Sequence, residues 1–437
     1  MYDLGKALRK ECFSYLVEFR AIIWIIMAEE IIIRDDIELG AWEGIGGAIT
    51  EATAFNFSKL DSKKQQELLD AYYGKNGLNY HWARVSIGSN DFCLKPYEYS
   101  QKKDLSDFSI QHDKRYVLPM LKKIVEEKDL KILASPWSPP KCLKLARKNR
   151  LSGKLKFWRY KTYARYIRKW LEAYAEEGID IDYITPQNEP FAKQIWESCT
   201  YSYLAQKRLA YKYLARQLDG LKTQILLWDH NKGRLAETAN RLFNGKYATE
   251  YGREKKVAGL CYHWYDGIFP DQMWQVRQKY PGIVMLSSEM SCGFSPYNKL
   301  KWQKDASLYC RELFADINAG ANAFIDWNML LSWQGGPSHC KNYVKSPIIL
   351  NEKEDDFVLT PIYEALKNFA HLFPVESEVV RCEYDSNNIV AIARKAKRGY
   401  KVVVMNTSDQ EQEVVIKLGK QKKNLRLARF EIVGVAI

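Results

Sequence analysis

Two glutamates stand in short polar segments, each of which follows a run rich in apolar residues. Glu189 belongs to 185–190 (TPQNEP), and Glu289 ends 283–289 (IVMLSSE). Hydrolysis of a β-glycosidic bond with retention of configuration needs two carboxyl groups about 5–5.5 Å apart. One protonates the leaving group, and the ionised one attacks the anomeric carbon. We therefore predict Glu189 as the general acid/base, with a raised pKa, and Glu289 as the nucleophile.

The order of elements along the chain predicts how these segments meet. From Gly44 onward, short β-rich runs alternate with amphipathic stretches, as in βα units around a parallel sheet. Strands are predicted at 44–48, 81–87, 131–136, 182–188, 223–229, 258–264, 283–289 and 322–328. Eight such units predict an α/β fold with a (β/α)8 TIM barrel, whose active site lies at the carboxyl ends of the strands. Glu189 and Glu289 would then lie at the ends of strands four and seven.

The rest of the chain predicts helices and a second, smaller domain. Helices are expected at 62–73, 116–127, 160–177, 203–218, 271–279, 300–318 and 359–372, the last with Thr360 as its N-cap before Pro361. Alternating strands follow at 378–384, 389–394, 401–406, 411–418 and 425–432, and no finishing strand is evident in the closing EIVGVAI. The predicted domains are an N-terminal segment contributing to the β side domain (1–43), the catalytic barrel (44–373) and the remainder of a small antiparallel β-sandwich side domain (374–437).

Composition limits the possible partners and the cellular location. The net charge of +13 is spread along the chain apart from a cluster between residues 141 and 159, and no nucleic-acid-binding motif accompanies it. The apolar run 21–28 is too short to span a bilayer, so no stable membrane insertion is expected. Nine widely spaced cysteines without a CxxC pair favour free thiols in the cytoplasm over disulfides or a zinc site. The oligomeric state is left open.

Several segments together resemble glycoside hydrolase family 30, the glucosylceramidase-like group. They are GIGGAITEA (44–52), ARVSIGSNDF (83–92), LASPWSPP (133–140), YAEEGIDIDYITPQNEP (174–190), WESC (196–199), LLWDHN (226–231), YHWYDG (262–267) and DWNMLLSWQGGPSH (326–339). They cover nearly the whole predicted barrel in the family's order. The resemblance implies a barrel joined to a β-sandwich, retention of configuration, neither metal nor cofactor, and a β-linked glycoside or glycolipid such as glucosylceramide as substrate.

The resemblance also implies the sugar-binding residues. Trp137 would form a stacking wall, and Asn188 would hold the 2-hydroxyl group. The same pocket would be lined by His263, Tyr265, Trp327 and Asn328. Other interpretations stay open: the two tryptophans could cap the core, His263 could be structural, and Asp91 could be a turn residue as readily as a sugar ligand. Asp229 and His230 are expected to brace the mouth of the barrel.

Two loops depart from the family's pattern. Gln101 follows Tyr97 and Tyr99 where the family carries an aspartate, and 141–144 (KCLK) replaces an aromatic segment. These departures predict intact catalytic machinery with altered sugar recognition. The leading hypothesis is an exo-acting β-glucosidase of the glucosylceramidase type. The alternatives are a β-xylosidase, β-fucosidase or β-1,6-glucanase with the same chemistry, a transglycosylase, and a non-catalytic carbohydrate-binding protein.

Overall fold

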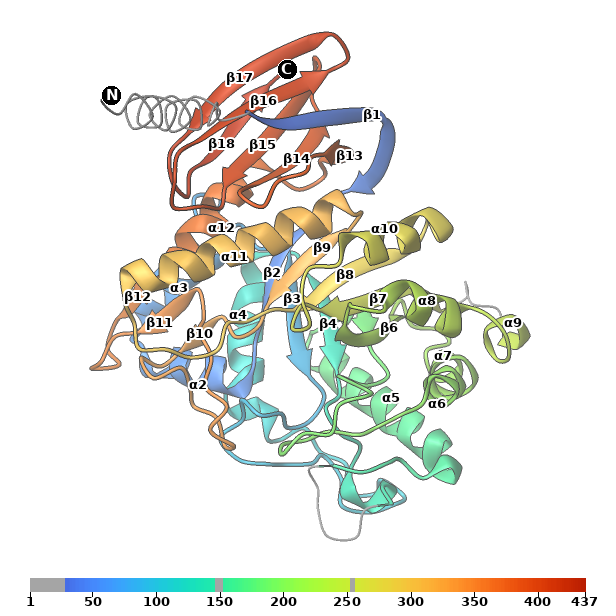
Figure 1. Ribbon diagram of the computed structural model, residues 1–437. Coiled ribbons are helices and arrows are strands. Elements are labelled where there is room, and N and C mark those ends of the chain that lie inside the picture. The colour runs from blue at the N-terminus through green and yellow to red at the C-terminus, as the bar shows by residue number, and fades with distance from the viewer. Residues whose placement is uncertain (1–27, 146–151, 252–255) are drawn as a thin grey trace, which may run out of the picture.

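The computed structural model describes residues 28–145, 152–251 and 256–437 (Figure 1). Eight parallel strands close a barrel in sequence order: β2 (Gly44–Ala48), β3 (Trp82–Ser86), β4 (Lys131–Ser135), β5 (Tyr183–Ile184), β6 (Gln224–Asn231), β7 (Val257–His263), β8 (Val284–Glu289) and β9 (Ala323–Asp326). All eight predicted strands are present. The fourth is much shorter than expected, because Pro186 cannot donate a backbone hydrogen bond and the chain leaves the sheet before it.

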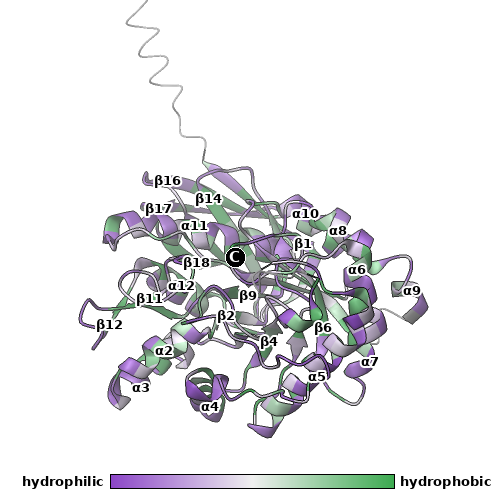
Figure 2. Ribbon diagram, turned by 90° about the horizontal axis from the view of Figure 1, so that it is seen from below, coloured by the Kyte–Doolittle hydropathy of each residue, from purple (hydrophilic) through white to green (hydrophobic). Residues whose placement is uncertain are grey.

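Helices surround the strands, as Figure 2 shows from the end opposite the side domain. They are α2 (Glu51–Lys59), α3 (Ser62–Tyr73), α4 (Val117–Glu127), α5 (Tyr160–Glu176), α6 (Tyr203–Lys207), α7 (Ala215–Gln217), α8 (Leu235–Phe243), α9 (Ala248–Tyr251), α10 (Pro270–Lys279), α11 (Lys299–Asn318) and α12 (Pro361–Leu372). In α5, buried Tyr163, Ile167, Trp170 and Tyr174 recur at three- or four-residue spacing and face the barrel.

Shorter elements complete the barrel domain. Three-residue 3₁₀ segments are η1 (Asp113–Arg115), η2 (Lys141–Leu143) and η3 (Phe157–Arg159), and a π-helical segment, η4 (Arg208–Leu214), joins α6 to α7. A small sheet that the sequence pattern did not predict contains β10 (Leu330–Leu331), β11 (Ile348–Leu350) and β12 (Phe357–Leu359). Because β12 takes up Leu359, the last barrel helix begins at Pro361, with Thr360 in the N-cap position.

The side domain is one seven-stranded, mostly antiparallel sheet in the order β17-β16-β1-β13-β14-β15-β18. Its strands are β1 (Glu29–Ala41), β13 (Glu378–Glu383), β14 (Ile389–Lys395), β15 (Tyr400–Asn406), β16 (Gln412–Leu418), β17 (Gln421–Leu427) and β18 (Ile432–Ala436). Ile389 and Ala391 of β14 share a buried cluster with Val414 of β16, so the sheet curls over its own core. The intervening Val390 and Ile392 belong to the barrel's core. The fold class predicted from the sequence is thus confirmed.

The end of the chain corrects one expectation. A single strand was predicted at 425–432, with none after it, whereas the structure has two strands there. β17 ends at Leu427, and β18 pairs with β15 through Val402–Val435 and Val404–Val433. The turn between them contains Phe430 with a φ of 56°. This turn contains no glycine, proline or asparagine, so the sequence pattern did not indicate it.

Figure 1 places the side domain against α11 and α12, while the loops that follow β3, β4 and β5 lie at the opposite end of the barrel. Among the described residues, no helix has the length and apolar character needed to cross a membrane. Residues 21–27 of the apolar run noted at 21–28 lie outside the described residues.

Candidate active site

The interior of the barrel has two layers of different chemistry. The layer nearer the amino ends of the strands, called the lower layer, is an apolar cluster that includes Trp82, Leu133, Leu226, Cys261 and Leu286. Successive inward-facing residues on a strand are two positions apart. Four of these residues are followed, two positions later, by a buried polar residue. These polar residues are Arg84, Ser135, His263 and Ser288. The carboxyl ends of the strands therefore meet in a buried polar layer, called the upper layer.

Asp229 is the hub of this polar layer. Its carboxylate lies 3.0 Å from Arg84 Nη2, accepts hydrogen bonds from Ser135, Thr185 and Ser288, and lies 3.1 Å from His263 Nε2. A register shift in β6 and the φ of 54° at Asp229 turn this residue inward. Burial alone would raise the pKa of Asp229, but the charges and donors of Arg84, His263 and Ser135 outweigh it and hold the pKa well below its usual range.

Arg84 connects this hub to the predicted nucleophile. Its Nη1 donates to Glu289 Oε2 at 2.6 Å, and its Nη2 donates to Asn188 Oδ1 at 2.9 Å. Tyr265 donates to the other carboxylate oxygen of Glu289 at 3.0 Å. Both oxygens of Glu289 are therefore fixed by donors. Since Arg84 occupies the amide oxygen of Asn188, the amide N–H groups are the ones left for a ligand.

Glu189 and Glu289 converge on one imidazole. His263 Nδ1 lies 3.4 Å from Glu189 Oε1 and 3.9 Å from Glu289 Oε1. The ring is fully buried, which alone would lower its pKa, but the charge of Glu289 and the contacts with Asp229 and Glu189 raise the pKa of His263 to about 10. His263 therefore carries a positive charge at neutral pH. Because one ring nitrogen is close to both carboxylates, the two face the same small space.

The protonation of Glu189 differs from the sequence-based expectation. We expected a raised pKa, and burial does act in that direction, but the neighbouring His230 and His263 outweigh it and hold the pKa well below its usual range. Gln194 also donates to Glu189 Oε2 at 3.2 Å. These contacts therefore favour the ionised form of Glu189. Its φ of 47° is a left-handed conformation that is uncommon for glutamate.

A cavity of about 520 Å³ opens above the two glutamates. Its lining includes Glu189 and Glu289 together with the predicted residues Asp91, Trp137, Asn188, Tyr265 and Trp327. Trp137 and Trp327 stack with their ring centroids 5.2 Å apart, and the Arg84 guanidinium carbon lies 4.9 Å from the Trp137 ring centroid. The cavity thus places flat aromatic walls beside carboxylates, an arrangement suited to sugars.

Asp91 offers an unpaired acceptor to this cavity. Asn342 donates to Asp91 Oδ2 at 2.8 Å, whereas Oδ1 is buried without a hydrogen-bond partner among the described residues. Burial raises the pKa of Asp91 to about 7. A buried acceptor without a partner is costly unless a ligand donates to it. Asp91 is therefore placed to accept hydrogen bonds from ligand hydroxyl groups.

Two predicted residues do not line the cavity. His263 lies beneath it, between the glutamates, and Asn328 is fully buried with its side-chain oxygen accepting a hydrogen bond from Thr50 at 2.6 Å. The divergent loop does not border it either. Tyr97 and Tyr99 both donate to the buried Asp113, and Gln101 is exposed. The substitution at Gln101 therefore lies away from this cavity.

The sequence did not single out several residues of the site. Arg84, Gln194, Trp196 and Asn342 are central to the observed geometry, but only the first and third lie in segments that resemble the family. The signal for Arg84 was its position two residues beyond Trp82, on the inward face of a strand. Asn342 follows a glycine-rich loop and has no comparable periodic signal.

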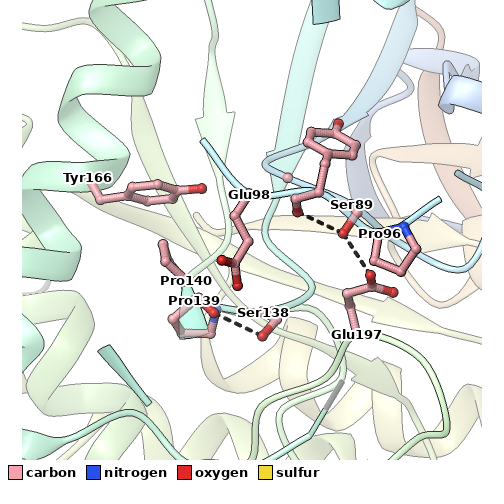
Figure 3. A pocket seen from close by; sticks show the side chains of 10 residues that line it. Ser89, Pro96, Glu98, Ser138, Pro139, Pro140, Tyr166 and Glu197 are labelled. Atoms are coloured by element: carbon pink, nitrogen blue, oxygen red, sulfur yellow. Dashed lines mark hydrogen bonds between the residues drawn. The ribbon is translucent and has the colours of Figure 1, made fainter. Parts of the chain in front are cut away.

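A second, much smaller cavity lies next to the loop that follows β5 (Figure 3). Its volume of about 10 Å³ suits a single water molecule rather than a sugar. Ser89 donates to Glu197 Oε1 at 2.7 Å at its edge, and His339 Nε2 lies 3.0 Å from Glu197 Oε2. Glu197 thus connects three loops that surround the larger cavity. Within the described ranges there is no cluster of residues suited to hold a metal ion.

Known proteins are similar to this chain in sequence and in fold. A model of the glycosyl hydrolase family 30 TIM-barrel domain matches residues 42–373. Putative glucosylceramidase 3 of Caenorhabditis elegans is 31% identical over 371 residues, which are 80% of this chain and 70% of that protein. An endo-1,6-beta-D-glucanase of Neurospora crassa is 30% identical over 207 residues, 43% of this chain and 42% of that one. The crystal structure of SrfJ from Salmonella typhimurium aligns with a TM-score of 0.85 and 26% identity, covering 92% of this chain and 91% of that one. The chain therefore belongs to glycosyl hydrolase family 30.

Proposed function

We propose that this glycosyl hydrolase is a retaining, exo-acting β-glucosidase of the glucosylceramidase type. The observation that carries the proposal is the convergence of Glu189 and Glu289 on His263 beneath an aromatic-walled cavity. The similarity to a putative glucosylceramidase supports the choice of sugar. Asp91 and Asn342 support the exo mode, because their polar groups can bind the hydroxyls of a terminal sugar.

In the first step, Glu289 attacks the anomeric carbon of the substrate. Arg84 and Tyr265 hold the two carboxylate oxygens, which orients the attacking one. A bond forms between Glu289 and the sugar as the bond to the leaving oxygen breaks, and a proton must reach that oxygen.

The proton comes from the pair formed by Glu189 and His263. Glu189 begins ionised while His263 Nδ1, 3.4 Å away, carries a proton. Substrate binding displaces solvent and covers Glu189, which weakens its charged form and favours transfer of this proton to the carboxylate. Glu189 then gives the proton to the leaving oxygen, and the lost charge of Glu289 removes one of the interactions that kept His263 protonated.

In the second step, Glu189 acts as a base. It accepts a proton from water, the water oxygen attacks the anomeric carbon, and the bond to Glu289 breaks. The sugar leaves with its original configuration. Both glutamates and the imidazole return to their starting charges once this proton moves from Glu189 to His263.

Replacement of Glu189 by glutamine tests these roles. Glu189→Gln should slow release of a poorly acidic alcohol from a β-glucoside by about 10²–10⁴-fold. With a dinitrophenyl β-glucoside, formation of the intermediate should persist, because that leaving group needs no proton, and added azide should restore turnover as β-glucosyl azide. Full turnover of the alkyl glucoside, or α-configured azide product, would contradict the proposal.

A second candidate is an endo-acting β-1,6-glucanase. The similarity to the Neurospora crassa enzyme favours it, although that match spans less than half of either chain. Digestion of a linear β-1,6-glucan separates the two candidates. Release of glucose alone from the first minutes supports the exo-glucosidase, whereas early release of mixed oligosaccharides supports the glucanase.

A further inference from the structure

Exposed apolar side chains are concentrated around the mouth of the barrel. All but three of the large ones that the structure describes lie in loops that follow barrel strands or in the first turn of the next helix, the exceptions being Ile32, Leu308 and Leu359. Those at the mouth are Leu145, Phe157, Trp158, Phe191, Ile195, Leu204, Tyr265, Phe294, Leu300 and Tyr343. Large apolar groups gathered at one end of a molecule mark an interaction surface.

The loop after β5 shows that this surface adjoins the catalytic cavity. Ala192, Gln194 and Trp196 line the cavity, whereas the alternate residues Phe191 and Ile195 are exposed. Ile195 is 73% exposed, although an aliphatic side chain gains nothing from contact with water. One short segment therefore forms the wall of the cavity on one side and an apolar outer rim on the other.

The loop after β4 belongs to a stretch of the chain whose sequence is strongly basic. Between Asp129 and Glu172 the sequence has 13 lysines and arginines and no acidic residue. Phe157 and Trp158, 59% and 58% exposed, lie in this stretch and contact each other edge to face. The Arg208 guanidinium of η4 lies over the Phe157 ring at 5.8 Å, and η4 lies in a second acid-free stretch, from residue 198 to 218. Thr200 N donates to Gly153 O, which holds the two loops together.

We propose that the mouth of the barrel docks onto an anionic lipid surface through a patch formed by Lys154, Lys156, Phe157, Trp158 and Ile195. Aromatic and aliphatic side chains enter the interface of a bilayer, while lysines bind anionic headgroups. Exposed aliphatic side chains favour lipid over an anionic polysaccharide, whose hydroxyl groups would not match them. The patch lies outside the catalytic cavity and binds the surface peripherally. The proposal rests on the proposed function in that the docked face would present the cavity to a lipid-linked sugar.

Vesicle binding tests the patch directly. The full chain is sedimented with vesicles of phosphatidylcholine alone and of phosphatidylcholine with phosphatidylserine, at low and high salt. The wild type should bind the anionic vesicles at least about tenfold more tightly, and salt should weaken this binding. Lys154→Glu with Lys156→Glu should reduce it by on the order of 30-fold. Phe157→Ser with Trp158→Ser should reduce it by on the order of tenfold.

A charge-matched control is available in the side domain. Lys420→Glu with Lys422→Glu changes two exposed lysines at the end of the molecule away from the mouth and should bind vesicles as the wild type does. All variants should keep wild-type turnover of a soluble aryl β-glucoside, which shows that they are folded. Equal binding to both vesicle types, unchanged binding by the mouth variants, equal loss in the control, or binding to an anionic polysaccharide without binding to vesicles would overturn the proposal. Absence of glucoside turnover in the wild type would instead contradict the proposed function, and vesicle binding would still decide the docking surface.

Discussion

The two layers inside the barrel are built by the same strands and do different work. The lower layer of Trp82, Leu226 and Leu286 needs only burial to be stable. The upper layer buries Arg84, Asp229, His263 and Glu289, whose charges must neutralise one another in fixed positions. Left-handed backbone conformations at Glu189, Asp229 and Asn328 occur at the same end of the barrel. The lower layer therefore stabilises the barrel, whereas the upper layer lowers its stability because it holds the proposed catalytic groups in fixed positions.

Removal of Arg84 should have the largest effect, because two buried carboxylates, Asp229 and Glu289, both lose their contact with its guanidinium. Arg84→Met should lower the free energy of unfolding by about 3–5 kcal/mol. The folded fraction should lose at least about 100-fold in kcat, since Glu289 loses its orienting donor. Denaturant titration and turnover of an aryl glucoside check this. A wild-type free energy of unfolding together with a wild-type kcat would show that the two layers do not differ in this way.

A cavity in the lower layer should destabilise the protein without affecting the chemistry. Leu286→Ala should lower the free energy of unfolding by about 2–5 kcal/mol. Its kcat on the aryl glucoside should remain within about twofold of wild type at a temperature where the variant is folded. A loss of kcat as large as that of Arg84→Met would show that the two layers are not separable.

Replacement of Asp91 should have effects opposite to those of Leu286→Ala: activity should fall and stability should rise. Asp91→Asn should lower kcat/KM by about 10–100-fold, because one acceptor for sugar hydroxyls is lost. Its folded pKa is about 7 and its unfolded pKa is near 4, so this residue makes the folded state less stable as pH rises from about 4 to 7. The variant should therefore gain stability relative to wild type at pH 8 more than at pH 4. Thermal unfolding at the two pH values measures this, and an equal effect at both would refute it.

The smallest effect is expected outside both layers, at His339. The hydrogen bond with Glu197 raises the pKa of His339. This contribution to stability is fully present below the unfolded pKa of about 6.5 and is lost as pH rises through the folded pKa. His339→Gln should cost about 1 kcal/mol at pH 6 and less at pH 9. A cost that grows with pH would contradict the assigned charge pair.

The sequence predicted the barrel well, because each strand is a short β-rich run between amphipathic helices. Glu189 and Glu289 could be singled out because each stands in a polar segment after such a run. Arg84 was missed because an arginine between Ala83 and Val85 looks like the outward-facing residue of an amphipathic strand. In a barrel covered by helices the outward face is apolar too, so the usual pattern is uninformative.

The protonation of Glu189 could not be predicted because it depends on contacts distant in sequence. Burial and a second carboxylate both raise a carboxyl pKa, and these were the only effects visible in the sequence. His230 and His263 come from the neighbouring strands β6 and β7, and their closeness to Glu189 depends on the register shifts in those strands. The prediction for the end of the side domain was wrong for a simpler reason: no turn-forming residue separates β17 from β18.

Covalent trapping tests directly whether Glu289 is the nucleophile. The protein is incubated with 2-deoxy-2-fluoro-β-glucosyl fluoride, in which fluorine slows release of the glycosyl-enzyme, and its peptides are then analysed by mass spectrometry. We expect one fluoroglucosyl group on Glu289, none on Glu189, and no labelling of Glu289→Gln. A label on any other residue, or loss of activity without a covalent adduct, would contradict this assignment.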